Sequence, residues 1–189
     1  MNIANKLTLA RVALVPVLLA LMYIKVPLNF LWALLVFTAA SLTDVFDGIL
    51  ARKRGLVTDF GKFLDPLADK VLVVAALIAF VGFGLAHPIA VILIVAREFM
   101  VSGIRLIASS SSGVVIAANR WGKIKTLLQT LVIIAAMAAF EWSRVIESER
   151  MMHMTRLGSE MGMWAVALFT VISGAVYLKE NWKMVTSSI

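Results

Sequence analysis

The sequence has 189 residues, of which 61% are hydrophobic and only 15% are charged. A soluble domain carries roughly 45–50% apolar and about 25% charged residues, so this composition excludes an ordinary soluble domain and indicates a polytopic membrane protein. The absence of cysteine excludes disulfides, thiolate catalysis and zinc–sulfur sites, and the net charge of +7 is spread between apolar stretches, which indicates anionic lipid rather than nucleic acid as the partner.

The first two hydrophobic segments are expected at residues 7–23 and 28–50. Three polar residues, which recur every third position and so lie along one side of a helix, open the first segment: Asn5, Thr8 and Arg11. Two aspartates stand near the exit of the second segment, and basic residues follow at once at 52–54. A basic cluster at the end of a span marks its cytosolic side.

The third and fourth segments are expected at residues 63–83 and 89–107. Two further aspartates lie in the first turns of the third segment, where Pro66 is tolerated because the early amides of a helix lack partners. The fourth segment contains Arg97 and Glu98. Charges inside a membrane are costly and usually face a partner or a wet cavity, so we expect a functional role for this pair.

The last two segments are expected to end near residue 140 and to cover residues 161–178. Lys123 and Lys125 open the fifth segment and diverge on a helix by about 160°. Ordinary cytosolic charge is the alternative to a binding role for them. Residues 141–157 form a polar segment of mixed sign and are predicted to be an external loop with an interfacial helix.

The sequence thus predicts an all-α protein with six transmembrane helices in a single domain, residues 1–189, without an internal repeat. Six spans put both termini on one side of the membrane. Only four of the 18 Lys and Arg residues then lie outside: Lys25, Arg144, Arg150 and Arg156. The positive-inside rule therefore predicts that both termini are cytosolic.

Four aspartates on two successive helices are the main candidates for chemistry. Asp44 and Asp47 are spaced i, i+3, and Asp65 and Asp69 are spaced i, i+4, so each pair shares a helix face. Converging carboxylates need neutralisation, for which hard divalent cations such as Mg²⁺ or Mn²⁺ are suited. Two such ions can stabilise the leaving group of an in-line displacement at a pyrophosphate. The alternative is four acids on water-exposed helix ends, against which the spacing argues.

The aspartates belong to a longer pattern that resembles the signature of the CDP-alcohol phosphotransferase family. Eight positions within 26 residues match it without a departure: Asp44, Asp47, Gly48, Ala51, Arg52, Gly61, Asp65 and Asp69. The resemblance implies a metal-dependent membrane enzyme with six helices, usually a homodimer. Such an enzyme transfers a phosphatidyl or similar group from a CDP-linked donor to an alcohol and releases CMP.

The resemblance also implies roles for individual residues. The four aspartates bind two divalent cations, and Asp69 is in addition the general base. The positions that bind the CDP-linked donor are Asn5, Thr8, Gly48, Ala51 and Arg52. Gly48 is small so that the cytidine can approach the helix, and Gly61 allows tight helix packing.

Most of the chain resembles one group of the family, the bacterial phosphatidylglycerophosphate synthases. The similar stretches are residues 11–16, 63–70, 96–99, 102–105 and 122–126. This resemblance implies transfer from CDP-diacylglycerol to sn-glycerol 3-phosphate, for phosphatidylglycerol synthesis, at a cytosol-facing site in the bacterial cytoplasmic (inner) membrane. Because the acceptor is a dianion, cations should bind its phosphate, and the predicted ligands are Arg97, Arg105, Lys123 and Lys125.

Two other functions remain open. The same signature serves enzymes that make phosphatidylserine or phosphatidylinositol phosphate, which differ in the acceptor alcohol. Outside enzymes, intramembrane acids can form a divalent-cation transporter. A transporter should carry polar or broken segments at the bilayer midplane and an inverted repeat. Here the acids collect on one side and the outer halves of the segments are apolar, which favours the enzyme.

Overall fold

The computed structural model describes residues 3–54, 59–111 and 120–187, and the side chains of residues 9–43, 70–105 and 121–182. Within these ranges all regular secondary structure is helical, as predicted, and there is no strand. The six helices are α1 (Ile3–Tyr23), α2 (Asn29–Arg54), α3 (Asp59–Phe83), α4 (Pro88–Ser111), α5 (Arg120–Val145) and α6 (Glu149–Ser187).

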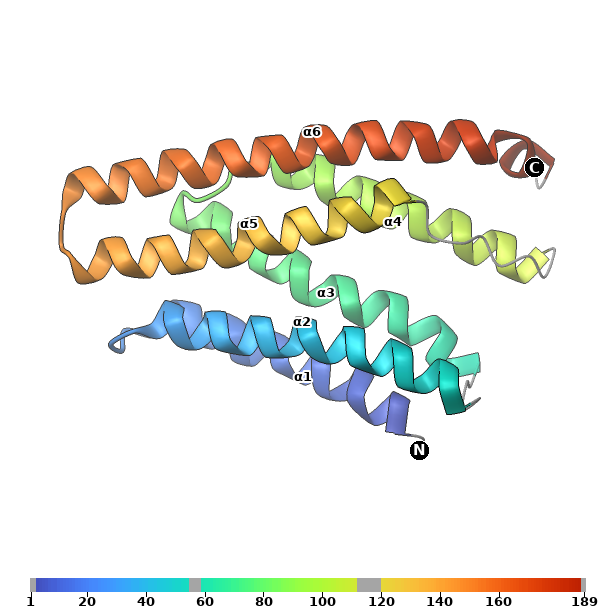
Figure 1. The fold of residues 1–189 in the computed structure, drawn as a ribbon, viewed down its shortest axis with the longest axis horizontal. Helices are drawn as coiled ribbons and strands as arrows, with labels where there is room; N and C mark the ends of the chain where they lie inside the picture. Colours follow the sequence, from blue (N-terminus) through green and yellow to red (C-terminus); the bar gives the residue numbers. More distant parts are fainter. Residues whose placement is uncertain (1–2, 55–58, 112–119, 188–189) are drawn as a thin grey trace.

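The helices form an elongated bundle in which successive helices run in opposite directions (Figure 1). The turns after α1, α3 and α5 lie at one end of the bundle, and the start of α1 and the end of α6 lie at the other. Short connections between long apolar helices produce this antiparallel order. Helix α1 packs against α2 and α3, while α6 packs along α4 and α5. An even number of helices thus leaves both ends of the chain at the same end of the bundle.

Each of the three short turns contains one residue with a left-handed backbone: Leu28 (φ 55°), Gly84 (φ 69°) and Glu147 (φ 54°). At the end of α3 the Leu85 N–H donates to the Phe80 carbonyl (2.8 Å) and the Gly84 N–H donates to the Val81 carbonyl (3.2 Å). This pair of bonds is the Schellman motif, for which glycine is favoured at the left-handed position. The chain therefore reverses sharply at Gly84 with the last carbonyls of α3 satisfied.

Polar side chains tie the turn between α1 and α2 to the end of α5. The Glu141 carboxylate accepts a hydrogen bond from the Phe30 N–H (2.9 Å), and so satisfies an amide in the first turn of α2. The Asn29 side chain donates to the Met22 carbonyl (3.1 Å), and Arg144 donates to the Asn29 oxygen. These bonds fix the two halves of the bundle to each other at the end away from the termini.

An aromatic cluster fills the core beside this polar network. The Phe30 ring lies 4.6 Å from the Phe140 ring and 4.9 Å from the Phe83 ring, and Tyr23 lies 4.9 Å from Phe83, all between centroids. These rings come from α1, α2, α3 and α5, and such pairs contribute roughly 0.5–1.5 kcal/mol each beyond the apolar area that they bury. The cluster therefore joins four helices at one level of the bundle.

The predicted external loop with an interfacial helix at residues 141–157 is right about the helix and wrong about the extent of the loop, which is only the turn at 146–148. Helix α5 continues to Val145, and α6 begins at Glu149 and runs without a break for 39 residues. Ser148 caps α6, since its Oγ accepts from the Met151 N–H (3.4 Å). The charges of this stretch lie largely on the exposed side of the helix, where they do not oppose helix formation. At roughly 58 Å, α6 is longer than the hydrocarbon core of about 30 Å.

The surface of the bundle matches a membrane environment. Two described segments are long and apolar enough to cross a bilayer, Trp121–Val145 and Glu149–Trp182, and three shorter apolar ones are Leu9–Tyr23, Asn29–Thr43 and Lys70–Phe83. Large apolar side chains are more than half exposed on several helices, among them Ile78 (62%), Ile92 (63%) and Leu168 (65%). A surface of this kind fits lipid rather than water and indicates a membrane protein.

Candidate functional site

The two acidic pairs lie on consecutive helices at one end of the bundle (Figure 1). Asp44 and Asp47 stand roughly 10–15 Å along the axis from the last residue of α2, and Asp65 and Asp69 stand roughly 9–15 Å from the first residue of α3. Since α2 and α3 are antiparallel, the backbone positions of the two pairs have a similar depth.

The side chains of these aspartates lie outside the described residues, so the ligation of metal ions stays a prediction. The other predicted positions with side chains outside the described residues are Asn5, Thr8, Gly48, Ala51, Arg52 and Gly61. Among the side chains that are described, no group of three or more His, Cys, Asp and Glu residues is placed to hold a metal ion.

A cluster of charged side chains lies where α3, α4 and α5 meet. We call Lys70, Arg97, Glu98 and Lys125 the Glu98 cluster. Lys125 donates a hydrogen bond to Glu98 Oε1, and the Arg97 Nη1 atom lies 3.5 Å from the same oxygen. The Lys70 Nζ atom lies 3.6 Å from Glu98 Oε2 and donates to the Glu98 carbonyl (3.1 Å). The side chain of Lys125 is only 2% exposed, and that of Arg97 10%.

The buried Arg97 side chain passes close to a glycine of α5 and a glycine of α6, and only the one on α6 is needed to make room for it. A Cβ atom at Gly174 of α6 would lie only 2.9 Å from Arg97 Cγ, so a larger residue there would force the arginine to move. A Cβ atom at Gly122 of α5 would lie 4.0 Å from Arg97 Nη2. Gly174 therefore makes room for the guanidinium in the middle of the bundle.

Arg105 and Tyr177 extend this region along α4 and α6. The guanidinium carbon of Arg105 lies 5.5 Å from the centroid of the Tyr177 ring, which is a cation–π geometry. Tyr177 is 2% exposed. Gly174, which Arg97 approaches, lies three positions before Tyr177 and so shares its face of α6. The two arginines and the tyrosine thus belong to one polar region that is continuous with the Glu98 cluster.

Several donors in this region have no hydrogen-bond partner in the described part of the chain. They are Arg97 Nε, Arg105 Nε, Thr170 Oγ1 and Tyr177 OH, and all four atoms are buried. Buried polar groups are normally hydrogen-bonded, so unpaired ones call for an explanation. Among the side chains that the structure describes, Glu98 is the one carboxylate that forms ion pairs with these cations. Buried cations with unpaired donors are suited to an anionic ligand.

The structure brings together three of the four predicted acceptor-phosphate ligands. Arg97 and Lys125 both contact Glu98, and Arg105 lies about two helical turns further along α4. Lys123 is exposed on α5 and does not join them. This separation confirms that the two lysines diverge around the helix. Glu98 forms ion pairs with Lys70, Arg97 and Lys125, while the functional role expected for the Arg97–Glu98 pair stays a prediction.

Sequence analysis missed several residues of this region. Lys70 directly follows Asp69, which was a usable signal for a residue near the site. Glu98 was recognised as an intramembrane charge but was given no part in the site. Gly174 and Tyr177 lie in an apolar segment that carries no motif, and only the packing of α6 against α4 reveals their contact with the arginines.

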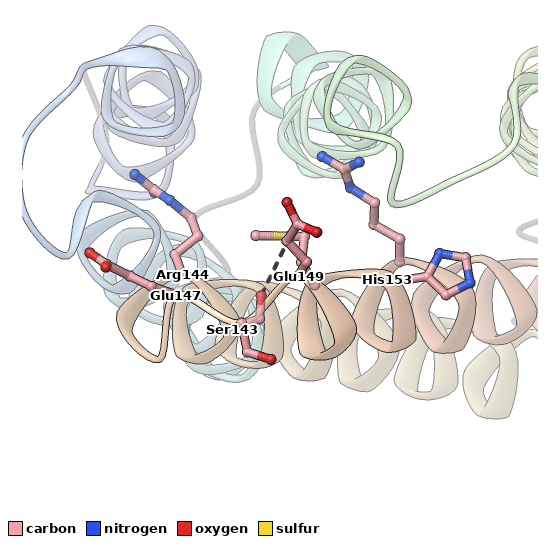
Figure 2. Close-up of a pocket in the computed structure, with 8 residues that line it drawn as sticks. Ser143, Arg144, Glu147, Glu149 and His153 are labelled. Carbon is pink, nitrogen blue, oxygen red and sulfur yellow. Dashed lines mark hydrogen bonds between the residues drawn. The ribbon is translucent and has the colours of Figure 1, made fainter.

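A cavity of about 490 Å³ lies elsewhere, at the turn between α5 and α6 (Figure 2). Its lining consists of Ser143, Arg144, Glu147, Ser148, Glu149, Met152, His153 and Arg156. Figure 2 shows Arg144 and Glu147 at one side and the His153 ring directed away from them. This cavity lies at the end of the bundle away from the acidic pairs, and its arginines and glutamates balance in charge. We therefore place the candidate site at the four aspartates and the Glu98 cluster.

Comparison with known proteins identifies the family of this chain. The family described as CDP-alcohol phosphatidyltransferase has a sequence model that matches residues 1–172. The CDP-diacylglycerol--glycerol-3-phosphate 3-phosphatidyltransferase of Bacillus subtilis is 42% identical, over 99% of this chain and 98% of that protein. Proteins of the same name from Rickettsia bellii (38% identical, 94% of each chain) and Mycoplasma pneumoniae (32% identical, 79% of this chain and 66% of that protein) are also similar. The chain belongs to the CDP-alcohol phosphatidyltransferase family.

Proposed function

We propose that this protein transfers the phosphatidyl group of CDP-diacylglycerol to sn-glycerol 3-phosphate and releases CMP. The names of its relatives and the eight-position signature support the reaction class. The observation that carries the choice of acceptor is the group of buried arginines between α4 and α6, whose Nε atoms have no hydrogen-bond partner among the described residues. An acceptor that bears its own phosphate can accept hydrogen bonds from these donors through charged oxygens, whereas serine or choline brings no phosphate.

The acceptor phosphate is assigned to Arg97, Arg105 and Lys125, with Lys123 as a fourth cation at the surface. A guanidinium binds phosphate through parallel N–H···O bonds, and the Nε atoms of both arginines are unpaired. Inositol phosphate is the runner-up acceptor because it presents the same group. The names of the relatives favour glycerol 3-phosphate.

The reacting groups are assigned to the aspartates at the end of α2 and the start of α3. Asp69 takes the proton of the acceptor's primary hydroxyl, whose oxygen then forms a bond to the β-phosphorus of CDP-diacylglycerol while the bond to CMP breaks. Asp44, Asp47, Asp65 and Asp69 are of the right type to hold two divalent cations, Mg²⁺ or Mn²⁺, which when bound neutralise the departing phosphate.

The donor is assigned to the same end of the bundle. The residues proposed to bind it are Asn5, Thr8, Gly48, Ala51 and Arg52, with Gly61 allowing α3 to pack closely. We also propose that all six helices cross the inner membrane with both termini in the cytosol, and that two copies form a homodimer. A cytosolic site at the bilayer edge receives a lipid tail from the membrane and a polar acceptor from solution.

An acceptor panel tests the assignment directly. Purified protein in mixed micelles with CDP-diacylglycerol and Mg²⁺ should release CMP with glycerol 3-phosphate at least about 10²-fold faster than with serine or choline, because buried cations left unpaired reject an acceptor without phosphate. Inositol phosphate should be slower than glycerol 3-phosphate. Faster turnover with any other alcohol would assign the protein to a different member of the family.

Replacement of Lys125 tests the acceptor site. Lys125→Met keeps much of the side-chain volume but removes a charge-assisted bond, so the KM for glycerol 3-phosphate should rise about tenfold. The KM for CDP-diacylglycerol should stay within about twofold, since the donor binds elsewhere. Lys179→Met, at an exposed position of α6, is the matched control. An unchanged KM for the acceptor would remove Lys125 from the site.

A further inference from the structure

Glu98 lies at the centre of a cationic region that is assigned to an anionic substrate. We propose that Glu98 is the positioning residue of the acceptor site: its carboxylate holds Lys125 and Arg97 in the orientation that binds the acceptor phosphate. The inference rests on the proposed function, which assigns Arg97, Arg105 and Lys125 to that phosphate but gives Glu98 no part.

The two carboxylate oxygens of Glu98 contact different cations. Oε1 accepts from Lys125 and lies 3.5 Å from Arg97 Nη1, whereas Oε2 lies 3.6 Å from Lys70 Nζ. The Glu98 carbonyl accepts from Lys70 (3.1 Å) and from Ser102 Oγ (2.8 Å). One residue of α4 therefore binds cations from α3, α4 and α5.

A negative residue cannot itself bind a phosphate dianion, so Glu98 acts through its neighbours. Lysine has a long flexible side chain, and a buried ammonium needs a counter-charge to stay inside the bundle. Glu98 supplies that charge to Lys125. It contacts Arg97 at Nη1 and leaves Arg97 Nε unpaired. The carboxylate thus fixes one edge of the guanidinium and leaves another for the substrate, which is preorganisation.

The same carboxylate connects the acceptor site to α3. Lys70 is the residue after Asp69, and both the side chain and the carbonyl of Glu98 contact it. A change at Glu98 therefore loosens the acceptor cations relative to the helix that carries the proposed base. Ser102 Oγ donates to the carbonyl of Glu98, so this bond fixes the backbone of α4 rather than the carboxylate.

The test compares Glu98→Gln, which removes the charge and keeps the shape, with Glu98→Asp, which keeps the charge. For Glu98→Gln the KM for glycerol 3-phosphate should rise about tenfold or more, while the KM for CDP-diacylglycerol stays within about twofold. Glu98→Asp should recover at least part of that loss. Glu160→Gln on α6 is the matched control. Equal acceptor KM values for wild type and Glu98→Gln, or a fall in kcat alone, would overturn the proposal.

A double variant covers the case in which Glu98→Gln does not fold because it leaves buried cations uncompensated. Glu98→Gln/Lys125→Met removes both partners. If Glu98 acts through Lys125 and Arg97, the acceptor KM of the double variant should be higher than that of Lys125→Met, because Arg97 also loses its partner, but lower than the two single effects multiplied. An acceptor KM equal to that of Lys125→Met, or a fully multiplied effect, would overturn the proposal. Should the wild type prefer another phosphorylated acceptor, that compound replaces glycerol 3-phosphate in every arm. The acceptor preference of the wild type thus tests the proposed function, and the variants of Glu98 test its positioning role separately.

Discussion

Asp69→Asn is expected to lower kcat by roughly 10²–10⁴-fold, because an amide cannot take the proton of the acceptor hydroxyl. Asparagine has nearly the size of aspartate, so packing in α3 should change little. The measurement is CMP release by the purified protein in mixed micelles with both substrates saturating. Glu149→Gln, at an exposed position of α6, is the control for removal of a carboxylate and should keep full turnover.

The proposed double role of Asp69 as base and metal ligand requires a second arm. If the Asp69→Asn substitution only weakened the binding of a cation, a higher Mg²⁺ concentration would restore kcat. If the carboxylate is the base, kcat stays low at any Mg²⁺ concentration. Turnover of Asp69→Asn near that of the wild type would exclude Asp69 as the base, and full recovery by Mg²⁺ would reduce its role to ligation.

Local spacing was sufficient to predict which segments of this chain are helical and where its acids stand. Asp44 and Asp47, or Asp65 and Asp69, need only the helical repeat to share a face. The opposed positions of Lys123 and Lys125 follow from the same rule, and the structure confirms that one is exposed and the other buried. These inferences involve residues at most four positions apart, for which helix geometry alone decides.

The prediction for residues 141–157 was wrong about the length of the loop, because a polar composition was taken as evidence of non-helical structure. Residues 141–157 mix charges of both signs with methionines, which led to the prediction of an external loop with an interfacial helix, yet all but the short turn at 146–148 are helical. Methionine, arginine and glutamate are good helix formers, and their charges need only an exposed side. A helix can extend beyond the bilayer without any break at the interface, and the sequence carries no signal for the depth at which α6 leaves the lipid.

The contacts around Glu98 were beyond prediction for a different reason. Its partners Lys70 and Lys125 are 28 and 27 positions away in the sequence. Whether α3 and α5 turn those lysines towards α4 depends on how three helices pack, which no single-helix pattern determines. The approach of Arg97 to Gly174 has the same origin. The resemblance therefore named Arg97 and Lys125 as phosphate ligands, but only the fold shows that Glu98 joins them.

Removal of divalent cations is expected to abolish CMP release, and added Mg²⁺ or Mn²⁺ to restore it. The departing CMP carries negative charge, and the proposed divalent cations neutralise it in the displacement. Asp44→Asn and Asp65→Asn should each raise the Mg²⁺ concentration for half-maximal activity at least about tenfold, because each removes an oxygen ligand. Glu160→Gln is the control and should leave that concentration unchanged. Undiminished activity after exhaustive chelation would exclude the metal-dependent reaction.

Thermal unfolding tests the same metal site without a measurement of turnover. Four carboxylates near one another in a low dielectric repel when no cation is bound. Without metal, the Asp65→Asn variant should therefore unfold at a higher temperature than the wild type. The order should reverse in Mg²⁺, since a bound cation stabilises the wild type according to its affinity and concentration, and the variant binds it more weakly. A metal-independent difference between the two proteins would mean that the aspartates do not converge on a common ion.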